Sequence, residues 1–305
     1  MMSRFDASTR SSLIPDPIAR QPWAMLIPLF LLVIFGSLVL YSAAGGNLYP
    51  FAASHLIRFF ILMVFTAILS SLPLLFIKYL AYPVYFFGLF LLVLVEITGS
   101  IGGGSQRWLD LGVIRLQPSE LMKPIIVLTI AKFYSNLPPV LTSNWRAIII
   151  PSAIMALPVA LILRQPDLGT SLAILAGGII VMFLAGIPFK WFIKAAGVVL
   201  LASPFLYHFA LSPYMQRRVA TFFNPESDPL GAGYHIAQSK IAIGSGGLTG
   251  KGFNEGSQSH LNYLPEPHTD FVFSAMVEEW GLLGGVFTLA MFTLIIFWGW
   301  KVARA

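Results

Sequence analysis

The sequence contains no cysteine and few charged residues. Without cysteine, neither disulfides nor thiolate metal sites can form, so the fold must be held together by packing. Only 10% of the residues are Asp, Glu, Lys or Arg, whereas a soluble globular domain averages about 25%. Hydrophobic residues make up 57% of the 305 residues. This balance excludes a soluble globular domain and indicates a membrane protein.

Long apolar runs dominate the chain. Because a membrane-spanning helix needs about 20 mostly apolar residues, each of these runs is long enough to cross a bilayer. We therefore predict an all-α, polytopic helical membrane protein with eight transmembrane helices. The run at 121–137 is the weakest candidate, since Glu120 and Lys123 lie at its start. The predicted spans are 24–44, 57–77, 80–99, 121–137, 146–163, 169–187, 191–211 and 271–300.

The orientation is predicted from the N-terminal segment and the basic residues. The first apolar run is longer than the core of a signal peptide, which has about 7–15 residues. We therefore expect residues 1–22 to form a cytoplasmic tail and the first helix to be retained. Total counts of Lys and Arg barely separate the two sides. On one side, however, they lie in short loops that flank helices, and this distribution predicts a cytoplasmic N-terminus.

Three segments on the predicted outer side have unusual compositions. Residues 100–120 begin with glycines and then alternate apolar with polar residues, which indicates an interfacial or re-entrant segment. The second segment, RQPDLGTS, is a proline turn in which Asp167 can cap the following helix. The third, 212–269, is too long for a simple connection between spans and is predicted to be functional.

The long loop contains a glycine-rich stretch, GSGGLTGKG, at 244–252. A phosphate-binding Walker A loop is excluded, because Ser245 replaces the first glycine and Gly252 replaces the Ser or Thr that binds magnesium. The sequence favours a glycine hinge near the membrane surface. Direct contact with an anion, through backbone N–H groups and Lys251, remains the alternative.

Acidic residues gather where the loop meets the last predicted span. Glu266, His268 and Asp270 precede the span, and Glu278 and Glu279 lie within it. Ionised groups inside a membrane are costly unless they are paired or wetted, so we predict structural pairing for the two glutamates, with direct function as the alternative. The His-Thr-Asp triplet imitates half of a non-haem iron site, but a magnesium ion held by Asp270 and a substrate phosphate fits the residues better.

Two further spacings predict local contacts. Gly281 and Gly285 form a small-xxx-small face, which is typical of helix packing in membranes. Glu120 and Lys123 are three residues apart, so they can pair on one helix face. If Lys123 were unpaired there, it would be a suitable phosphate ligand.

Five motifs together resemble a known family. They are GGGSQRWLDLG, LQPSELMKP, RQPDLGTS, GSGGLTGKG and LPEPHTDFVFSAMVEEWGLLG, in this order among the predicted spans. From Trp23 onward the chain is similar to the SEDS family (shape, elongation, division and sporulation) of bacterial membrane proteins. WLDLG before QPSELMK resembles the elongation branch more than the division branch. The chain departs from the family in two places. Position 267 is Pro, where relatives commonly carry Arg or Ala. The sequence also ends after the eighth span, whereas the family pattern has ten spans, so a fragment is one interpretation.

The resemblance implies a peptidoglycan glycosyltransferase. Such an enzyme polymerises lipid II into glycan strands at the outer face of the bacterial cytoplasmic (inner) membrane during cell elongation, and releases undecaprenyl diphosphate. It also implies a large extracytoplasmic loop between spans seven and eight, here 212–269. The implied partners are a class B penicillin-binding protein, which is a transpeptidase, and other membrane proteins of the elongation complex. Membrane lipid is expected as a partner and nucleic acid is not.

The same resemblance implies the site residues. Asp270 would be the catalytic base, or the ligand of a divalent cation such as Mg²⁺ or Mn²⁺, with a helix N-cap as its alternative role. Trp108 would stack on sugar or lipid, or act as an interfacial anchor. The cations for the leaving diphosphate would be Arg107, Lys123, Arg217, Lys240 and Lys251. The remaining candidates for substrate binding would be Glu120, Glu266 and His268.

Two other functions use the same residues. A lipid II flippase would pass the headgroup across the bilayer, and a non-catalytic scaffold would only hold partner enzymes of the elongation complex. The motifs concentrate on one face, whereas a translocation path needs polar residues at the midplane and on both sides. Keeping acids and cations near lipid without use is costly, which disfavours the scaffold.

Overall fold

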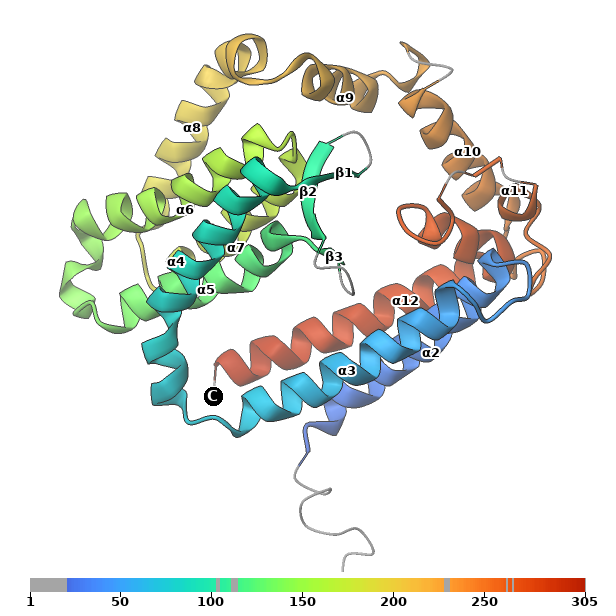
Figure 1. The fold of residues 1–305 in the computed structure, drawn as a ribbon, viewed down its shortest axis with the longest axis horizontal. Coiled ribbons are helices and arrows are strands. Elements are labelled where there is room, and N and C mark those ends of the chain that lie inside the picture. Colours follow the sequence, from blue (N-terminus) through green and yellow to red (C-terminus); the bar gives the residue numbers. More distant parts are fainter. Residues whose placement is uncertain are drawn as a thin grey trace, which may run out of the picture. The chain divides into compact units, whose positions relative to one another are not determined.

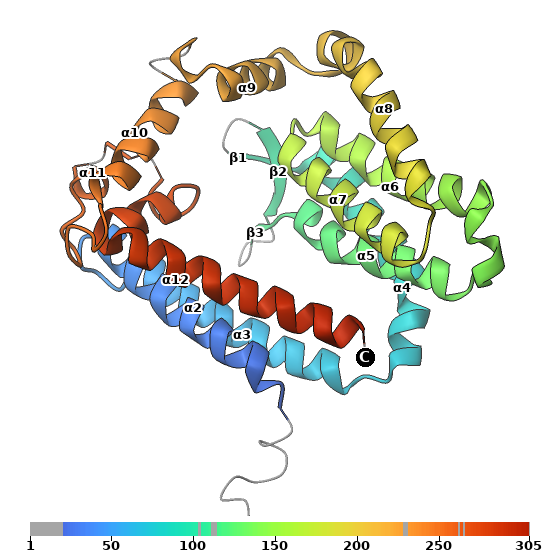
Figure 2. The ribbon, with the colours of Figure 1, turned by 180° about the vertical axis from the view of Figure 1, so that it is seen from behind.

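The computed structural model describes residues 21–102, 105–110, 115–227, 231–261, 263–264 and 266–304. The predicted tail, 1–22, lies almost wholly outside the described residues. The chain forms two compact units, which Figures 1 and 2 show from opposite sides. The first unit combines the chain up to Thr66 with the chain from Pro225 onward, and the second contains Ala67–Asn224.

The first unit is built on long helices that lie side by side. The helix α12 packs along α2, and α10 and α11 pack on α12. Phe30 of α2 meets Phe59 of α3 edge to face, with ring centroids 5.4 Å apart. A small core of Val39, Met276 and Val277 joins α2 to α12. The elements are α2 (Trp23–Ala43), α3 (Phe51–Ser71), which continues past the unit boundary, a 3₁₀ turn (Pro225–Ser227), α10 (Ala232–Ser245), α11 (Ser257–His260) and α12 (Val272–Ala303).

The second unit has a helical core around α5, which packs against α4, α6 and α7. Its centre is apolar, and Leu92, Met122, Ile126, Ile162 and Ile174 are fully buried there. The elements are α4 (Leu74–Thr98), β1 (Ser100–Gly102), β2 (Ser105–Asp110), β3 (Arg115–Leu116), α5 (Pro118–Ser135), a 3₁₀ turn (Pro139–Ser143), α6 (Arg146–Arg164), α7 (Leu168–Leu184), α8 (Phe189–Phe205), its π-helical end (Leu206–Ala210) and α9 (Pro213–Phe223).

All eight predicted apolar runs are helical, which confirms the helical membrane fold. Within the described residues, six helices are long and apolar enough to cross a membrane: α2, α3, α4, α6, α8 with its π-helical end, and α12. The other two runs fall short for different reasons. The helix α7 is apolar but has only 17 residues, and α5 carries Glu120, Lys123 and Lys132.

The predicted second span and the predicted start of the third span are wrong. Instead of 57–77 and 80–99, the structure has helices from Phe51 to Ser71 and from Leu74 to Thr98. Pro73 separates them, because a proline disfavours helical conformation in the residue before it and fits the start of a helix. The prediction missed the polar start of the first helix and placed that helix too far along the chain. For the second helix only the start is too late, since the predicted end at 99 agrees with Thr98.

A small sheet in residues 100–116 departs from the all-α prediction. The strands β1, β2 and β3 are antiparallel in that order, with Ile101 opposite Gln106 and Asp110 opposite Arg115. The sequence predicted an interfacial or re-entrant segment here. Its alternation of apolar and polar residues has the two-residue period of a strand, which the prediction did not use.

Candidate functional site

Asp270 lies in the turn that precedes α12. Its side chain is exposed, and no described residue makes a hydrogen bond or ion pair with it. The cap position of α12 is Phe271, and no side chain caps this helix. The alternative role of Asp270 as an N-cap is therefore not observed, and its carboxylate is free for other chemistry.

Glu266 and His268 order the turn that carries Asp270. His268 Nε2 lies 3.2 Å from Glu266 Oε2, and the imidazole stacks on Phe51 of α3 with ring centroids 3.8 Å apart. The backbone carbonyl of Glu266 accepts hydrogen bonds from the N–H groups of Thr269 and Phe271, on either side of Asp270. Two of the predicted site residues thus pair with each other and fix the turn.

The helix α10 runs beside the start of α12. Ser239 Oγ and Ser274 Oγ are 2.6 Å apart, and the ring of His235 lies 6.3 Å from that of Phe271. Lys240, next to Ser239 in sequence, is exposed and has no partner among the described residues. Lys240 lines a cavity of about 470 Å³ together with Pro225, Glu226, Gly233, Tyr234, Ile236, Ala237 and Ile241.

Glu278 is paired inside the first unit, as predicted. Its side chain is completely buried, and its Oε1 accepts from Lys251 Nζ at 2.5 Å and from the backbone N–H of Gln258 at 3.0 Å. Ser257 Oγ also donates to Glu278, at 3.1 Å, and accepts from Lys251 Nζ at 2.7 Å. Lys251 is therefore the partner of a buried acid and does not present a free charge.

Glu279 has different partners from its neighbour. Ser42 of α2 donates a hydrogen bond to its Oε1, and His260 Nε2 lies 3.7 Å from the same oxygen. Adjacent residues on a helix point about 100° apart, which is why the two acids face different segments. The prediction of structural pairing thus holds for both glutamates.

The glycine-rich stretch packs against a break in α12. Gly281 has φ 65° and ψ −165°, which interrupts the helix. The N–H groups of Lys251 and Gly252 donate to the carbonyls of Glu278 and Glu279, at 2.9 and 3.1 Å. In return, the carbonyls of Gly247 and Leu248 accept from the N–H groups of Leu282 and Leu283.

These contacts decide two of the predictions. A Cβ at Gly281 would lie 2.3 Å from the backbone nitrogen of Gly250. The absence of a side chain at Gly281 therefore lets the backbone of α12 approach the backbone of the glycine-rich stretch. The predicted helix-packing role of Gly281 and Gly285 is therefore wrong for Gly281. The N–H groups of Lys251 and Gly252 donate to α12, which disfavours the alternative of direct anion contact through these groups.

In the second unit, Arg107 joins β2 to the turn between α6 and α7. Its Nε donates to the carbonyl of Gln165 at 3.0 Å, another guanidinium nitrogen donates to that of Pro166, and a third lies 3.8 Å from Asp167. Asp167 Oδ1 accepts from the N–H of Thr170 at 3.1 Å, which confirms the predicted cap of α7. All three nitrogens of Arg107 are engaged, and only 18% of its side chain is exposed.

The remaining candidates in this unit lie nearer the surface. Lys123 Nζ is 2.7 Å from Glu120 Oε2 in the first turn of α5, so the predicted pair is present. Trp108 is partly buried on β2, beside Arg107. Arg217 is exposed on α9 and has no partner among the described residues.

Among the described residues, no group of three or more His, Asp or Glu side chains could hold a metal ion. Asp270 can still supply one carboxylate to an ion whose other ligands are phosphate oxygens and water, which is a common arrangement for magnesium. Glu266 and His268 are less suited, because each is engaged with the other.

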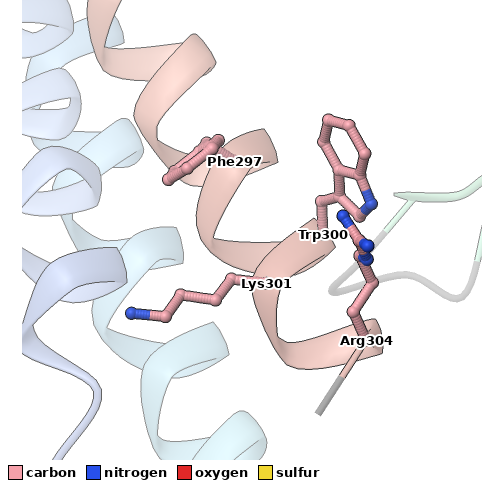
Figure 3. A pocket seen from close by; sticks show the side chains of 4 residues that line it. All are labelled: Phe297, Trp300, Lys301 and Arg304. Carbon is pink, nitrogen blue, oxygen red and sulfur yellow. The ribbon is translucent and has the colours of Figure 1, made fainter.

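A second hollow lies at the opposite end of α12 from Asp270. It has a volume of about 350 Å³ and is lined by Phe297, Trp300, Lys301 and Arg304. Figure 3 shows Arg304 beside the indole of Trp300, and their cation–π distance is 5.7 Å. The hollow belongs to the far end of the helix and is separate from the turn that carries Asp270.

Comparison with known proteins identifies the family. The family model for the cell cycle proteins FtsW, RodA and SpoVE matches residues 22–305. Peptidoglycan glycosyltransferase MrdB of Escherichia coli K12 is 41% identical over 286 residues, which cover 92% of this chain and 75% of MrdB.

Solved structures agree with this assignment. A chain from a peptidoglycan synthase complex, described for its structural coordination of polymerization and crosslinking, is 32% identical with a TM-score of 0.73, covering 90% of this chain and 76% of its own. The rod shape determining protein RodA of Thermus thermophilus is 26% identical with a TM-score of 0.63, covering 90% and 73%. The chain therefore belongs to the FtsW/RodA/SpoVE family of multi-pass membrane proteins, the family that its five motifs predicted.

Proposed function

We propose that this protein is a peptidoglycan glycosyltransferase that polymerises lipid II during cell elongation. Its family membership and the activity named for its relative MrdB support the reaction class. The Asp270 carboxylate supports it further, because it is exposed and makes no structural contact with the described residues. The turn that carries it is held by Glu266, His268 and Phe51.

The proposed chemistry is the transfer of a glycan from a lipid diphosphate to a sugar hydroxyl. The hydroxyl oxygen of one lipid-linked disaccharide attacks the anomeric carbon of the other and forms the new C–O bond. The bond from that carbon to the diphosphate oxygen breaks, and undecaprenyl diphosphate leaves with the electron pair. Asp270 takes the proton of the attacking hydroxyl, which is the role of a general base.

The leaving diphosphate needs positive charge nearby. Lys240 belongs to the same unit as Asp270, is exposed and has no partner in the described part of the chain, so we assign it to this charge. Lys123 is a further candidate from the family resemblance alone, and it pairs here with Glu120. We assign Arg107 and Lys251 to holding their segments in place, because their nitrogens already bind protein groups.

A divalent cation would add to this site without replacing any residue. When bound at Asp270, Mg²⁺ or Mn²⁺ would neutralise part of the charge of the diphosphate. Trp108 is proposed to stack on sugar or lipid. The paired Glu266 and His268 keep Asp270 in position.

The proposed setting is the bacterial inner membrane, with the N-terminus in the cytoplasm and the loop 212–269 outside. The spread of basic residues over short loops supports this orientation. The similarity to a chain from a peptidoglycan synthase complex supports a class B penicillin-binding protein as partner. Other membrane proteins of the elongation complex are further proposed partners.

Reconstitution tests the proposal against its two alternatives. The purified protein and its partner transpeptidase, in vesicles with labelled lipid II, should produce long glycan strands. A flippase would move the label across the bilayer without forming polymer, and a scaffold would do neither. Either of the latter results, with a folded protein, would reject the glycosyltransferase assignment.

A further inference from the structure

The short helix α9 directly follows an apolar span. Its sequence, PYMQRRVATFF, contains two arginines and no acidic residue. On a helix with 3.6 residues per turn, Met215, Val219 and Phe222 share one side, and Phe223 lies beside them. Arg217 and Ala220 lie on the other side, and Arg218 lies at the border between the two. The helix is therefore amphipathic and basic.

A reciprocal contact fixes α9 to the end of α8. Gln216 Nε2 donates to the carbonyls of Tyr207 and Leu211, at 2.9 and 3.0 Å, and Tyr207 donates its hydroxyl to the carbonyl of Gln216 at 3.3 Å. The Ser212 hydroxyl caps the first turn of α9. Figure 1 shows α9 turning away from the line of α8 at this corner, so the span ends where α9 begins.

The side chains of α9 leave apolar rings and cations uncovered together. Phe222 and Phe223 are 75% and 81% exposed. Arg217 and Arg218 are also exposed, and the described residues supply no carboxylate to either of them. The guanidinium of Arg218 lies 5.2 Å from the ring of Tyr214, which leaves its charge intact. Exposed aromatic rings are unfavourable in water, and unneutralised arginines are unfavourable in hydrocarbon. The environment that suits both lies at the boundary between the two.

We infer that α9 lies in the headgroup layer of the bilayer at the end of α8 and binds anionic phospholipids. Phe222 and Phe223 enter the boundary of the acyl chains, while Arg217 and Arg218 bond the phosphates of the headgroups. Basic amphipathic helices with aromatic apolar faces bind membranes in this way, and anionic lipid strengthens the binding. Arginine suits the role because its planar guanidinium bonds two phosphate oxygens at once.

The inference does not depend on the glycosyltransferase reaction. It gives Arg217 a bilayer lipid as ligand in place of the substrate diphosphate, and it holds the start of the loop 212–269 at the membrane surface. The ligand class is a glycerophospholipid with a net negative headgroup, such as phosphatidylglycerol.

The absence of cysteine in the chain makes a depth measurement straightforward. Single variants Phe222→Cys and Ala220→Cys of the full chain would carry a nitroxide label in vesicles of phosphatidylglycerol and phosphatidylcholine. We expect the label at 222 to be more accessible to oxygen, which concentrates in the acyl region, than to a water-soluble nickel chelate. At 220, on the polar side of α9, the order should reverse. A label at 222 that is as accessible to the chelate as the label at 220 would overturn the inference.

The arginines are tested in the same system. With the label at 222, the double change Arg217→Gln and Arg218→Gln should remove the difference in depth between vesicles that contain phosphatidylglycerol and vesicles of phosphatidylcholine alone. Arg164→Gln is the matched control, because Arg164 is exposed in the same unit but pairs with Glu96 at 3.4 Å. An unchanged lipid dependence in the double variant would refute the assignment of these arginines. If the lipid dependence of the depth is unchanged and the double variant no longer binds lipid II, Arg217 would be assigned to the substrate instead.

Discussion

Lys251→Met would leave Glu278 without its charged partner in the interior of the first unit. The Glu278 side chain is 0% exposed, and Lys251 is 28% exposed. Methionine keeps most of the length of the lysine side chain but carries no charge. Among the described residues, the carboxylate of Glu278 would retain Ser257 and the N–H of Gln258 as donors.

The expected loss of stability is large. Removing one partner of a buried ion pair costs about 3–5 kcal/mol, and a native domain is stable by only about 5–15 kcal/mol. The two remaining donors place the expected value near the lower end, at about 3 kcal/mol. The converse change, Glu278→Gln, removes the buried charge and leaves a lysine that can reach water, so it should cost less, about 1–2 kcal/mol.

The free energy of unfolding would be measured by titration with sodium dodecyl sulfate in mixed micelles, followed by tryptophan fluorescence. The double variant Lys251→Met with Glu278→Gln should be more stable than Lys251→Met alone, because no charge is then buried unpaired. Lys123→Met is the control, since its pair with the exposed Glu120 should contribute at most about 1 kcal/mol. A Lys251→Met variant as stable as the parent, or a double variant no more stable than Lys251→Met, would show that Lys251 does not stabilise the buried Glu278 carboxylate.

Three further predictions concern the break in α12, the contact of Arg107 and the topology. Gly281→Ala should destabilise the protein by about 1–3 kcal/mol through overpacking and so lower its thermal melting temperature. Gly299→Ala, which has open space at its Cβ, should leave that temperature unchanged. Equal melting temperatures of the two variants would contradict the role given to Gly281. Arg107→Lys should lose the hydrogen bonds to the two carbonyls, which should lower the free energy of unfolding by about 1.5–3 kcal/mol. A variant with unchanged stability would argue against this contact. A single cysteine at 226 should react with an impermeant thiol reagent added outside cells and one at Lys78 should not, while the reverse pattern would invert the proposed topology.

Features that depend on local sequence could be predicted, because the residues that cause them are close together in the chain. The eight apolar runs are all helical, and Asp167 caps α7 only three residues before its donor Thr170. The pair Glu120 and Lys123 follows from helix geometry in the same way. The boundary at Pro73 was missed because hydrophobicity was weighted above the local effect of a proline.

Features that depend on contacts between distant residues could not be predicted. The resemblance implies a substrate role for Arg107, whereas its hydrogen bonds to protein go to carbonyls 58 and 59 positions away in the chain. The spacing of Gly281 and Gly285 predicts helix packing, whereas Gly281 instead lies against the backbone of Leu248 and Gly250, where a side chain would not fit. The pairing of Glu278 was expected from its burial in a span, yet nothing in the sequence named Lys251 as the partner.

The rate of glycan polymerisation by Asp270→Asn shows whether Asp270 performs the chemistry. Asparagine keeps the shape of the side chain but cannot take up the proton of the attacking hydroxyl. The variant, with its partner and labelled lipid II, should bind substrate and lose about 10²–10⁴-fold in rate, whereas Glu255→Gln, at an exposed acid of the same loop, should retain the parent rate. Polymerisation by Asp270→Asn at close to the parent rate would contradict the assignment and would make Glu266 or Glu120 the next candidate.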